Sequence, residues 1–156
     1  LVFSTLHTND APSAVTRLID MGIKPFLVAS SVRAIMAQRL MRRICKECAA
    51  PYTPDPYELQ VLGIDEEIMK NSKFMKGRGC AKCGNTGYKG RMGIYEIFML
   101  TEELQHLIYE KVSSNVIKEA ARKSGMRTLR EDALRKAMAG TTSLEEVIRA
   151  TVTDEE

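Results

Sequence analysis

The sequence predicts an α+β protein that is mostly helical, and three observations support this fold class. Two short runs, residues 1–5 and 93–98, have the apolar or alternating pattern of β-strands. Residues 9–43 and 101–151 instead place apolar side chains at helical spacing. Between these helical regions, residues 45–91 hold all four cysteines and most of the ten glycines of the chain, so this part is expected to be rich in turns.

The first elements follow from residues that cap or break helices. Residues 1–5 predict a buried strand, and because such a strand needs neighbours, we expect an N-terminal part of the protein to precede Leu1. Asp10 followed by Pro12 predicts the start of a helix, since an aspartate caps the first turn and a proline fits within it. Gly22 predicts the end of this helix.

A second helix is predicted to begin at Pro25. It is expected to be longer and more apolar than the first, to continue through Leu40 and to end in the basic run Arg39, Arg42 and Arg43, which the helix dipole favours. This run can contact a nucleotide, an acidic lipid or a neighbouring subunit, or it can be a solvated helix end. It also closely precedes Cys45 and can balance the charge of thiolates.

The rest of the chain predicts one strand and several helices. Residues 54–56 and 65–67 predict the starts of short helices, and residues 93–98 predict a strand. Four further helices are expected to start at Thr101, Ser114, Leu129 and Ser143.

Carboxylates in the helical tail are expected at the surface. Ser143 and Glu146 have the spacing of a capping box at the start of the last helix. We expect Glu145, Glu146 and the carboxylates of residues 154–156 to be solvated or to interact with helix dipoles.

Composition limits the classes of function. Hydrophobic residues make up 44% and charged residues 28% of the chain, the balance of a soluble globular protein. No signal peptide is apparent, and no apolar run approaches the roughly 20 residues that cross a bilayer. The net charge of +3 and the aromatic content of 6% give little support for nucleic-acid binding. We therefore expect a cytoplasmic protein, in which cysteines indicate metal more than disulfides.

The four cysteines form two close pairs, Cys45 with Cys48 and Cys80 with Cys83. Two Cys-x2-Cys pairs can complete a tetrahedron of thiolates around one zinc ion, and four cysteines leave no open position for a substrate. The sequence therefore predicts a structural zinc site, with nearby lysines and arginines offsetting the thiolate charge. Two disulfides or four unrelated thiols are the simpler alternatives, and an iron–sulfur cluster is the alternative metal site.

His7 follows the predicted first strand. In open α/β sheets ligands bind beyond the carboxyl ends of the strands. A histidine there can donate a hydrogen bond to a phosphate or help to order an attacking water, although a lone histidine can equally be a surface or packing residue.

Residues 4–18, Ser-Thr-Leu-His-Thr-Asn-Asp-Ala-Pro-Ser-Ala-Val-Thr-Arg-Leu, resemble the histidine box of the secretion ATPases, the motors of type II secretion and type IV pilus assembly. The resemblance continues over nearly the whole chain, at residues 21–26, 37–40, 87–91, 93–96 and 142–146 and in both cysteine pairs. The four cysteines favour the assembly-type branch, because the pilus-retraction branch generally lacks this insert.

The resemblance implies the architecture and the partners of the protein. Residues 1–44 would be the C-terminal remnant of a RecA-like P-loop ATPase core, residues 45–92 a zinc subdomain and residues 93–156 a helical subdomain. The family usually forms hexamers that use ATP and Mg²⁺ in the cytoplasm, docked on inner-membrane platform proteins, to help extract pilin or pseudopilin. His7 would contact the terminal phosphate of ATP, and Arg17, Gln38 and Arg39 would contribute to nucleotide binding.

The chain departs from the family pattern in two motifs. It contains no Gly-x4-Gly-Lys-Ser/Thr loop and no apparent Walker-B strand. Phosphoryl transfer needs that loop and a bound magnesium ion. We therefore expect this part of the protein to be inactive in ATP hydrolysis on its own.

Two other functions remain open from the sequence. The four cysteines and the modest basicity also suit a zinc-ribbon module that binds nucleic acid, although the helical tail mixes both signs of charge, so no nucleic acid is expected as a partner. A structural adaptor with no nucleotide role is the third possibility.

Overall fold

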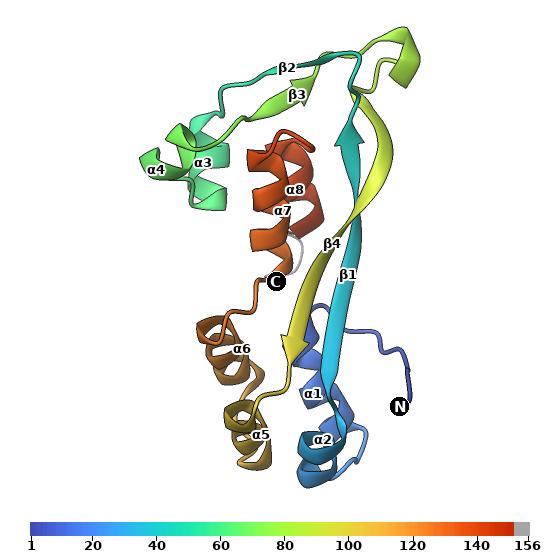
Figure 1. Ribbon diagram of the computed structural model, residues 1–156, viewed down its shortest axis with the longest axis vertical. Coiled ribbons are helices and arrows are strands. Elements are labelled where there is room, and N and C mark those ends of the chain that lie inside the picture. The colour runs from blue at the N-terminus through green and yellow to red at the C-terminus, as the bar shows by residue number, and fades with distance from the viewer. Residues whose placement is uncertain (152–156) are drawn as a thin grey trace. The chain divides into compact units, whose positions relative to one another are not determined.

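The structure, a computed structural model, describes residues 1–151 and has an α+β fold, as predicted. These residues form eight α-helices, one 3₁₀ helix and four β-strands (Figure 1). Contacts divide the chain into two compact units. Unit 1 comprises Leu1–Gln38 and Tyr95–Thr128, and unit 2 comprises Arg39–Ile94 and the chain from Leu129 onward. The carboxylates expected at residues 154–156 lie outside the described residues.

The two long strands contribute residues to both units. Strand β1 (Ala34–Ile44) pairs with β4 (Tyr88–Met99), and the two arrows run in opposite directions in Figure 1. The predicted long helix through Leu40 is therefore wrong, because α2 (Pro25–Ser31) ends after seven residues. From Ala34 to Met41 exposure alternates at every residue, which is the period of a strand. This stretch contains many good helix formers, and pairing with β4 overrides their intrinsic preference.

Four helices build unit 1. They are α1 (Ala11–Asp20), α2, α5 (Glu102–Tyr109) and α6 (Ser114–Lys123), and α1 packs on α6 while α2 packs on α5. The predicted start of α1 is confirmed, since the carboxylate of Asp10 accepts a hydrogen bond from the backbone N–H of Ser13 at 2.9 Å. The same carboxylate pairs with Lys118 of α6 at 2.9 Å. Asp10 therefore caps one helix and links it to another.

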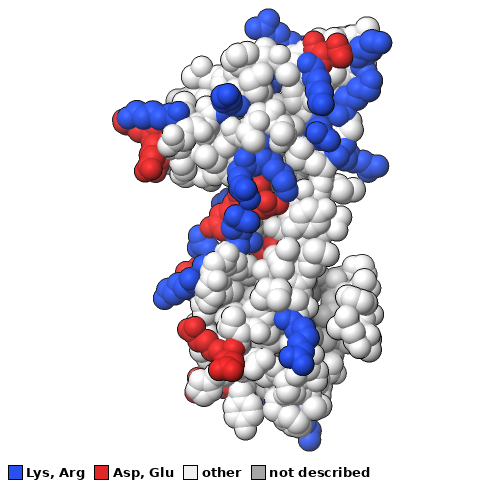
Figure 2. All heavy atoms as spheres, in the orientation of Figure 1, with Lys and Arg blue, Asp and Glu red and all other residues white. Residues whose placement is uncertain are grey.

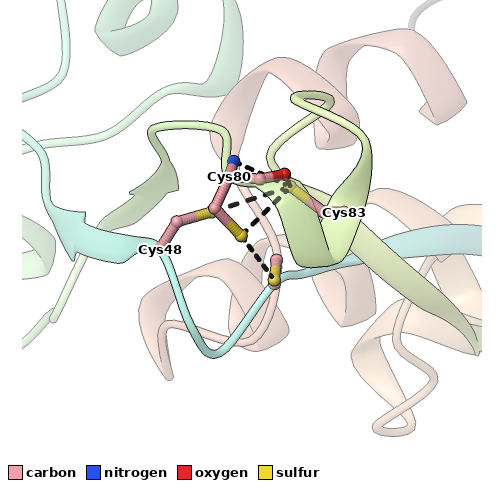
Figure 3. A group of neighbouring side chains, drawn as sticks. Cys48, Cys80 and Cys83 are labelled. Carbon is pink, nitrogen blue, oxygen red and sulfur yellow. Dashed lines mark hydrogen bonds between the residues drawn. The ribbon is translucent and has the colours of Figure 1, made fainter.

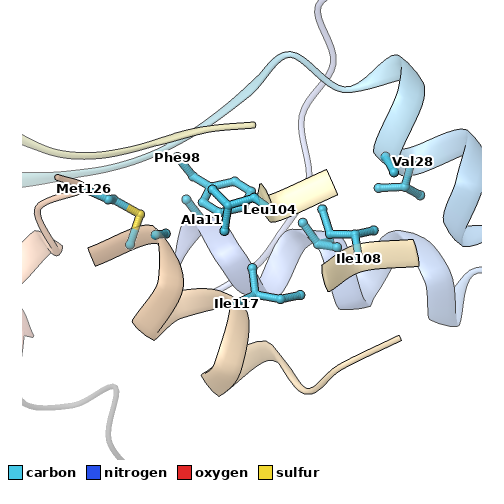
Figure 4. Close-up of a cluster of buried hydrophobic side chains, with 10 residues drawn as sticks. Ala11, Val28, Phe98, Leu104, Ile108, Ile117 and Met126 are labelled. Atoms are coloured by element: carbon cyan, nitrogen blue, oxygen red, sulfur yellow. The ribbon is translucent and has the colours of Figure 1, made fainter. Parts of the chain in front are cut away.

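The core of unit 1 lies between these helices and the end of β4 (Figure 4). Its fully buried members include Phe98 from β4, Leu104 and Ile108 from α5, and Ile117 from α6. Each of them lies on the apolar face of its element, so that burial follows from the sequence periodicity.

The expected strand at residues 1–5 is not formed. Residues 1–8 have no regular secondary structure, and Leu1, Val2 and Phe3 are at least 89% exposed. A strand must satisfy its backbone N–H and C=O groups by pairing with another strand. None of the strands among residues 1–151 pairs with this segment.

Unit 2 contains a small antiparallel sheet and four helices. Strand β2 (Ala49–Pro51) pairs with β3 (Met75–Gly77), with Ala50 opposite Lys76. The helices are α3 (Pro56–Leu62), α4 (Glu66–Lys70), α7 (Leu129–Met138) and α8 (Leu144–Thr151). Asp55 and Asp65 cap the two short helices, as the sequence predicted, and α8 packs on α7 and α3.

The helices after residue 100 divide between the two units, because α5 and α6 belong to unit 1 whereas α7 and α8 belong to unit 2. The division into domains at residues 44 and 92 stays a prediction.

The carboxylate of Glu146 is fully buried in the first turn of α8. Of the two expectations for it, solvation is therefore wrong, whereas its position fits an interaction with the helix dipole. It accepts hydrogen bonds from the backbone N–H of Arg42 at 2.8 Å and from the guanidinium groups of Arg42 and Arg149. Burial acts to raise the pKa of Glu146, but the hydrogen bonds from Arg149 and Arg42 outweigh it and lower the pKa to about 2. Ser143 accepts from the backbone N–H of Glu146, so only half of the predicted capping box is formed.

Arg42 also connects α8 to the first residue of β4. Its guanidinium lies 4.1 Å from the centre of the Tyr88 ring, in the geometry of a cation–π contact. The hydroxyl of Tyr88 is hydrogen-bonded to the hydroxyl of Ser143 at 2.6 Å. Arg42 is therefore a structural residue of unit 2 and not a solvated helix end.

Candidate metal centre and histidine segment

The small sheet of unit 2 brings the two cysteine pairs together. Cys45 directly follows β1 and Cys48 directly precedes β2. Cys83 is the last residue of the 3₁₀ helix η1 (Ala81–Cys83). Cys80 directly precedes this helix and lies three residues after the end of β3. Because β2 and β3 are antiparallel, the residues before one strand and after the other meet at the same end of the pair.

The four sulfur atoms have the arrangement that one tetrahedral ion requires (Figure 3). The Sγ atoms of Cys80 and Cys83 are 3.7 Å apart, Cys45 and Cys80 are 3.9 Å apart, and all four lie within 4.8 Å of one another. A zinc ion with sulfur ligands at about 2.3 Å needs sulfur separations of about 3.8 Å. All four cysteines are free, so the alternative of two disulfides is not found. The donor set and its spacing fit a structural zinc ion.

Backbone N–H groups point at one of the sulfurs. Those of Cys80 and Gly87 each lie 3.3 Å from the Sγ of Cys83. Burial acts to raise the pKa of the Cys83 thiol, but these hydrogen bonds lower it to about 6. Burial, together with hydrogen bonds from neighbouring thiols, raises the pKa of Cys48 to about 11. Several thiolates in one place repel one another, and a divalent cation removes that conflict by favouring the ionised form of each.

Two glycines allow the backbones of the cysteine loops to approach closely. A Cβ atom at Gly77 would lie 2.0 Å from the carbonyl oxygen of Gly87, and one at Gly87 would lie 2.6 Å from that of Gly77. Gly87 also has a φ of +77°, which side chains disfavour. Next to it, the backbone N–H of Cys45 donates to the carbonyl of Gly87 at 2.9 Å. The close packing of the two loops therefore depends on glycine.

The residues predicted to contact nucleotide lie in the segment before α1, on α1 and on β1. His7 is exposed, and neither it nor the exposed Arg17 on α1 has a side-chain hydrogen bond or ion pair within residues 1–151. Gln38 is an exposed residue of β1. Arg39 is half-buried in unit 2 and donates from Nη1 to the carbonyl oxygen of Ala150 at 2.9 Å. Their roles in nucleotide binding stay predictions.

Glu96 is a buried polar residue of unit 1 that sequence reasoning missed. Its side chain is 1% exposed and accepts a hydrogen bond from the backbone N–H of Ala11, the first residue of α1, at 2.7 Å. A carboxylate at this position stabilises the positive end of the helix dipole. The sequence pattern of β4 could have predicted this burial. Successive side chains of a strand point to opposite faces, so Glu96 shares a face with the buried Ile94 and Phe98.

None of the helices within residues 1–151 is both long enough and apolar enough to cross a membrane.

Comparison with known proteins identifies similar sequences along almost the entire chain. Residues 1–149 match the family described as "Type II/IV secretion system protein". The chain is 47% identical over 152 residues to the type IV pilus assembly ATPase PilB of Thermus thermophilus, covering 97% of this chain and 17% of that protein. It is 44% identical to the type II secretion system protein E of Pseudomonas aeruginosa, with 97% of this chain and 30% of that protein covered. The type II secretion system ATPase E of Vibrio cholerae is 42% identical, with 97% and 29% covered. The chain thus spans less than a third of the length of these relatives.

Proposed function

This chain belongs to the type II/IV secretion system protein family, as its motifs predicted, and we propose that it forms the C-terminal part of a cytoplasmic ATPase that powers type II secretion or type IV pilus assembly. The observation that carries the proposal is the match over residues 1–149, together with relatives at 42–47% identity that are named as ATPases. Relatives of both kinds are similarly close, so the proposal covers either machine.

In the whole protein, unit 1 would continue a RecA-like ATPase core. His7 would donate a hydrogen bond to the terminal phosphate of ATP or to the attacking water, and Arg17, Gln38 and Arg39 would contribute to the nucleotide site. Two features support a ligand role for His7. Its side chain is exposed and has no hydrogen bond within residues 1–151, so both ring nitrogens are available. It lies three residues before Asp10, whose cap and ion pair hold the start of α1 in place.

The phosphate-binding loop and the residues that hold Mg²⁺ would come from the part of the protein outside this sequence. This proposal follows from the absence of a Gly-x4-Gly-Lys-Ser/Thr motif in a chain that covers only 17–30% of these relatives. The backbone donors and the lysine of that loop hold the phosphates during phosphoryl transfer. The isolated 156-residue chain is therefore expected to show no ATP hydrolysis.

Cys45, Cys48, Cys80 and Cys83 would bind one structural zinc ion. Such an ion supplies no chemistry to ATP hydrolysis, because four thiolates fill its coordination sphere. It would hold the end of β1 against the loop before β4 and so fix the fold of unit 2.

The proposed partners are neighbouring subunits of a homohexamer and the inner-membrane platform proteins of the machine, with the motor peripheral to the membrane. Exposed apolar residues in unit 1 support contacts with further protein surface, and they include Phe3, Met21, Phe26 and Leu27.

Replacement of His7 in the full-length protein tests the proposal. We expect His7→Ala to lower the ATPase rate by about a hundredfold or more, as the loss of one hydrogen-bond donor to a reacting phosphate does. His106→Ala is the matched control, because His106 is the only other histidine of this sequence and lies exposed on α5 beside Glu110. Equal ATPase activity and transport in the His7 variant and the control would favour the adaptor function instead.

A further inference from the structure

A cavity of about 400 Å³ lies beside the cysteine cluster in unit 2. Five cationic side chains line it, and its one acidic residue is Glu47. The cations come from the end of β1, from both cysteine loops and from the start of β4, and they are Arg43, Lys46, Lys82, Lys89 and Arg91. In Figure 2, Lys and Arg side chains gather over this end of unit 2.

These five cations have no protein partner among the residues that the structure describes, unlike several other basic residues of unit 2. None of their side chains forms a hydrogen bond or an ion pair within residues 1–151, and all five are exposed. In contrast, Arg42 and Arg149 share Glu146, Lys76 pairs with Glu145, and Lys136 pairs with Asp132. Like charges collected around one hollow surface focus the electric field there and attract anions.

The negative charge of a filled metal centre is smaller than the positive charge that lines the cavity. Four thiolates with one divalent cation carry a net charge of about −2. The five cations outnumber the single carboxylate of the cavity by four, so an excess of positive charge remains beside a filled centre. The sequence suggested that these lysines offset the charge of the thiolates. That role therefore accounts for only part of the positive charge around the cavity.

We propose that this cavity binds a ligand that carries two or more phosphate groups. The remaining charge matches a multivalent anion, and lysine and arginine are the side chains that bind phosphate oxygens. A volume of about 400 Å³ is in the range of ligand sites and exceeds the needs of a single phosphate. Gly90 lies between Lys89 and Arg91 with a φ of +82°, and without a side chain it leaves the lining open to a ligand.

The phosphate groups can come from a soluble compound or from the headgroups of anionic lipid. Both sources present the same oxygens to the same cations. The lining of the cavity includes none of the residues proposed for the nucleotide site, which are His7, Arg17, Gln38 and Arg39. The proposal stands whether or not His7 takes part in ATP hydrolysis.

The test uses the full-length protein and a triple variant, Lys46→Gln, Lys82→Gln and Lys89→Gln. Isothermal titration calorimetry with inorganic pyrophosphate measures the soluble arm. Cosedimentation with vesicles of phosphatidylglycerol and phosphatidylcholine, against phosphatidylcholine alone, measures the lipid arm. The control is Lys24→Gln, Lys111→Gln and Lys123→Gln. It removes the same charge from exposed lysines outside the cavity that have no side-chain partner within residues 1–151.

We expect the cavity variant to bind at least one probe about tenfold more weakly or worse, while the control variant keeps the affinity of the original protein. Loss of pyrophosphate binding alone assigns a soluble ligand, and loss of vesicle binding assigns a lipid headgroup. Replacing the same three lysines by arginine should preserve binding, which separates loss of charge from damage to the fold. Equal affinities in the cavity and control variants, or no binding of either probe by the unmodified protein, would overturn the proposal.

Discussion

Replacement of the buried carboxylate of Glu146 is expected to destabilise unit 2 more than replacement of its exposed neighbour Glu145. In Glu146→Gln, an amide replaces a fully buried carboxylate that accepts hydrogen bonds from Arg42 and Arg149. Removing one partner from a fully buried ion pair costs about 3–5 kcal/mol. The two arginine side chains are 41% and 56% exposed, so water screens part of the interaction and we expect about 2 kcal/mol.

Urea denaturation at pH 7, with amide hydrogen exchange in α8 as a local measurement, tests this expectation. Glu145→Gln is the matched control, because Glu145 is the neighbouring residue, is exposed and pairs with Lys76 at 3.3 Å. It should change the free energy of unfolding by less than about 1 kcal/mol. Equal effects of the two substitutions on unfolding and on exchange in α8 would refute the reasoning.

The same contacts determine a pH dependence. The pKa of Glu146 is lowered from 4.5 to about 2 in the folded protein, so its carboxylate stabilises the fold fully above pH 4.5. This contribution should be lost as the pH falls from about 4.5 to about 2, where the folded protein also takes up the proton. The stability difference between the original protein and Glu146→Gln should therefore be constant from pH 7 to 5 and decrease at lower pH.

Three other outcomes are expected. Metal analysis of the purified protein should give about one zinc per chain. A chelator should increase hydrogen exchange in residues 45–87 before it increases exchange in unit 1. Oxidised cysteines without bound metal would contradict this prediction. Gly87→Ala should destabilise unit 2 by about 1–3 kcal/mol in thermal unfolding. Gly84 also has a positive φ, but no atom lies within 4 Å of a Cβ added there, so Gly84→Ala should destabilise unit 2 less. Titration with duplex DNA at two salt concentrations should show no strong binding. Strong binding that weakens steeply as the salt concentration rises would instead favour a nucleic-acid-binding module.

The sequence predicted the elements whose signals are local. The caps Asp10, Asp55, Asp65 and Thr101 start helices in the structure, because a cap depends only on its own side chain and the next three residues. The family was also recognised from motifs in one chain, and the match over residues 1–149 confirms it.

Long-range contacts account for what could not be predicted. Residues 34–44 form a strand because β4 pairs with them, and helix propensity alone could not reveal that partner. Glu96 and Glu146 are buried beside hydrogen-bond donors, Ala11 and Arg42, that lie 85 and 104 residues away in the sequence. Their hydrogen-bond partners could therefore not be predicted from neighbouring residues. A carboxylate on a predicted strand or helix is more often exposed, and only the fold supplies its partner. The cavity beside the cysteines likewise needs both loops to be in place.

A metal bound by the cysteine cluster would stabilise the middle of the chain, which has only a small apolar core. Residues 45–87 contain only a few buried apolar side chains, among them Leu62, Ile64 and Phe74. A metal that joins the two cysteine pairs closes a loop of about 35 residues, and a cross-link of that length reduces the entropy of the unfolded chain by the equivalent of about 4 kcal/mol. The same closure would fix the end of β1 against the start of β4, where Arg42 lies beside Tyr88 and Glu146. Loss of the metal should therefore weaken the ion pair at Glu146 as well as the cysteine loops, although no cysteine touches that carboxylate within the described residues.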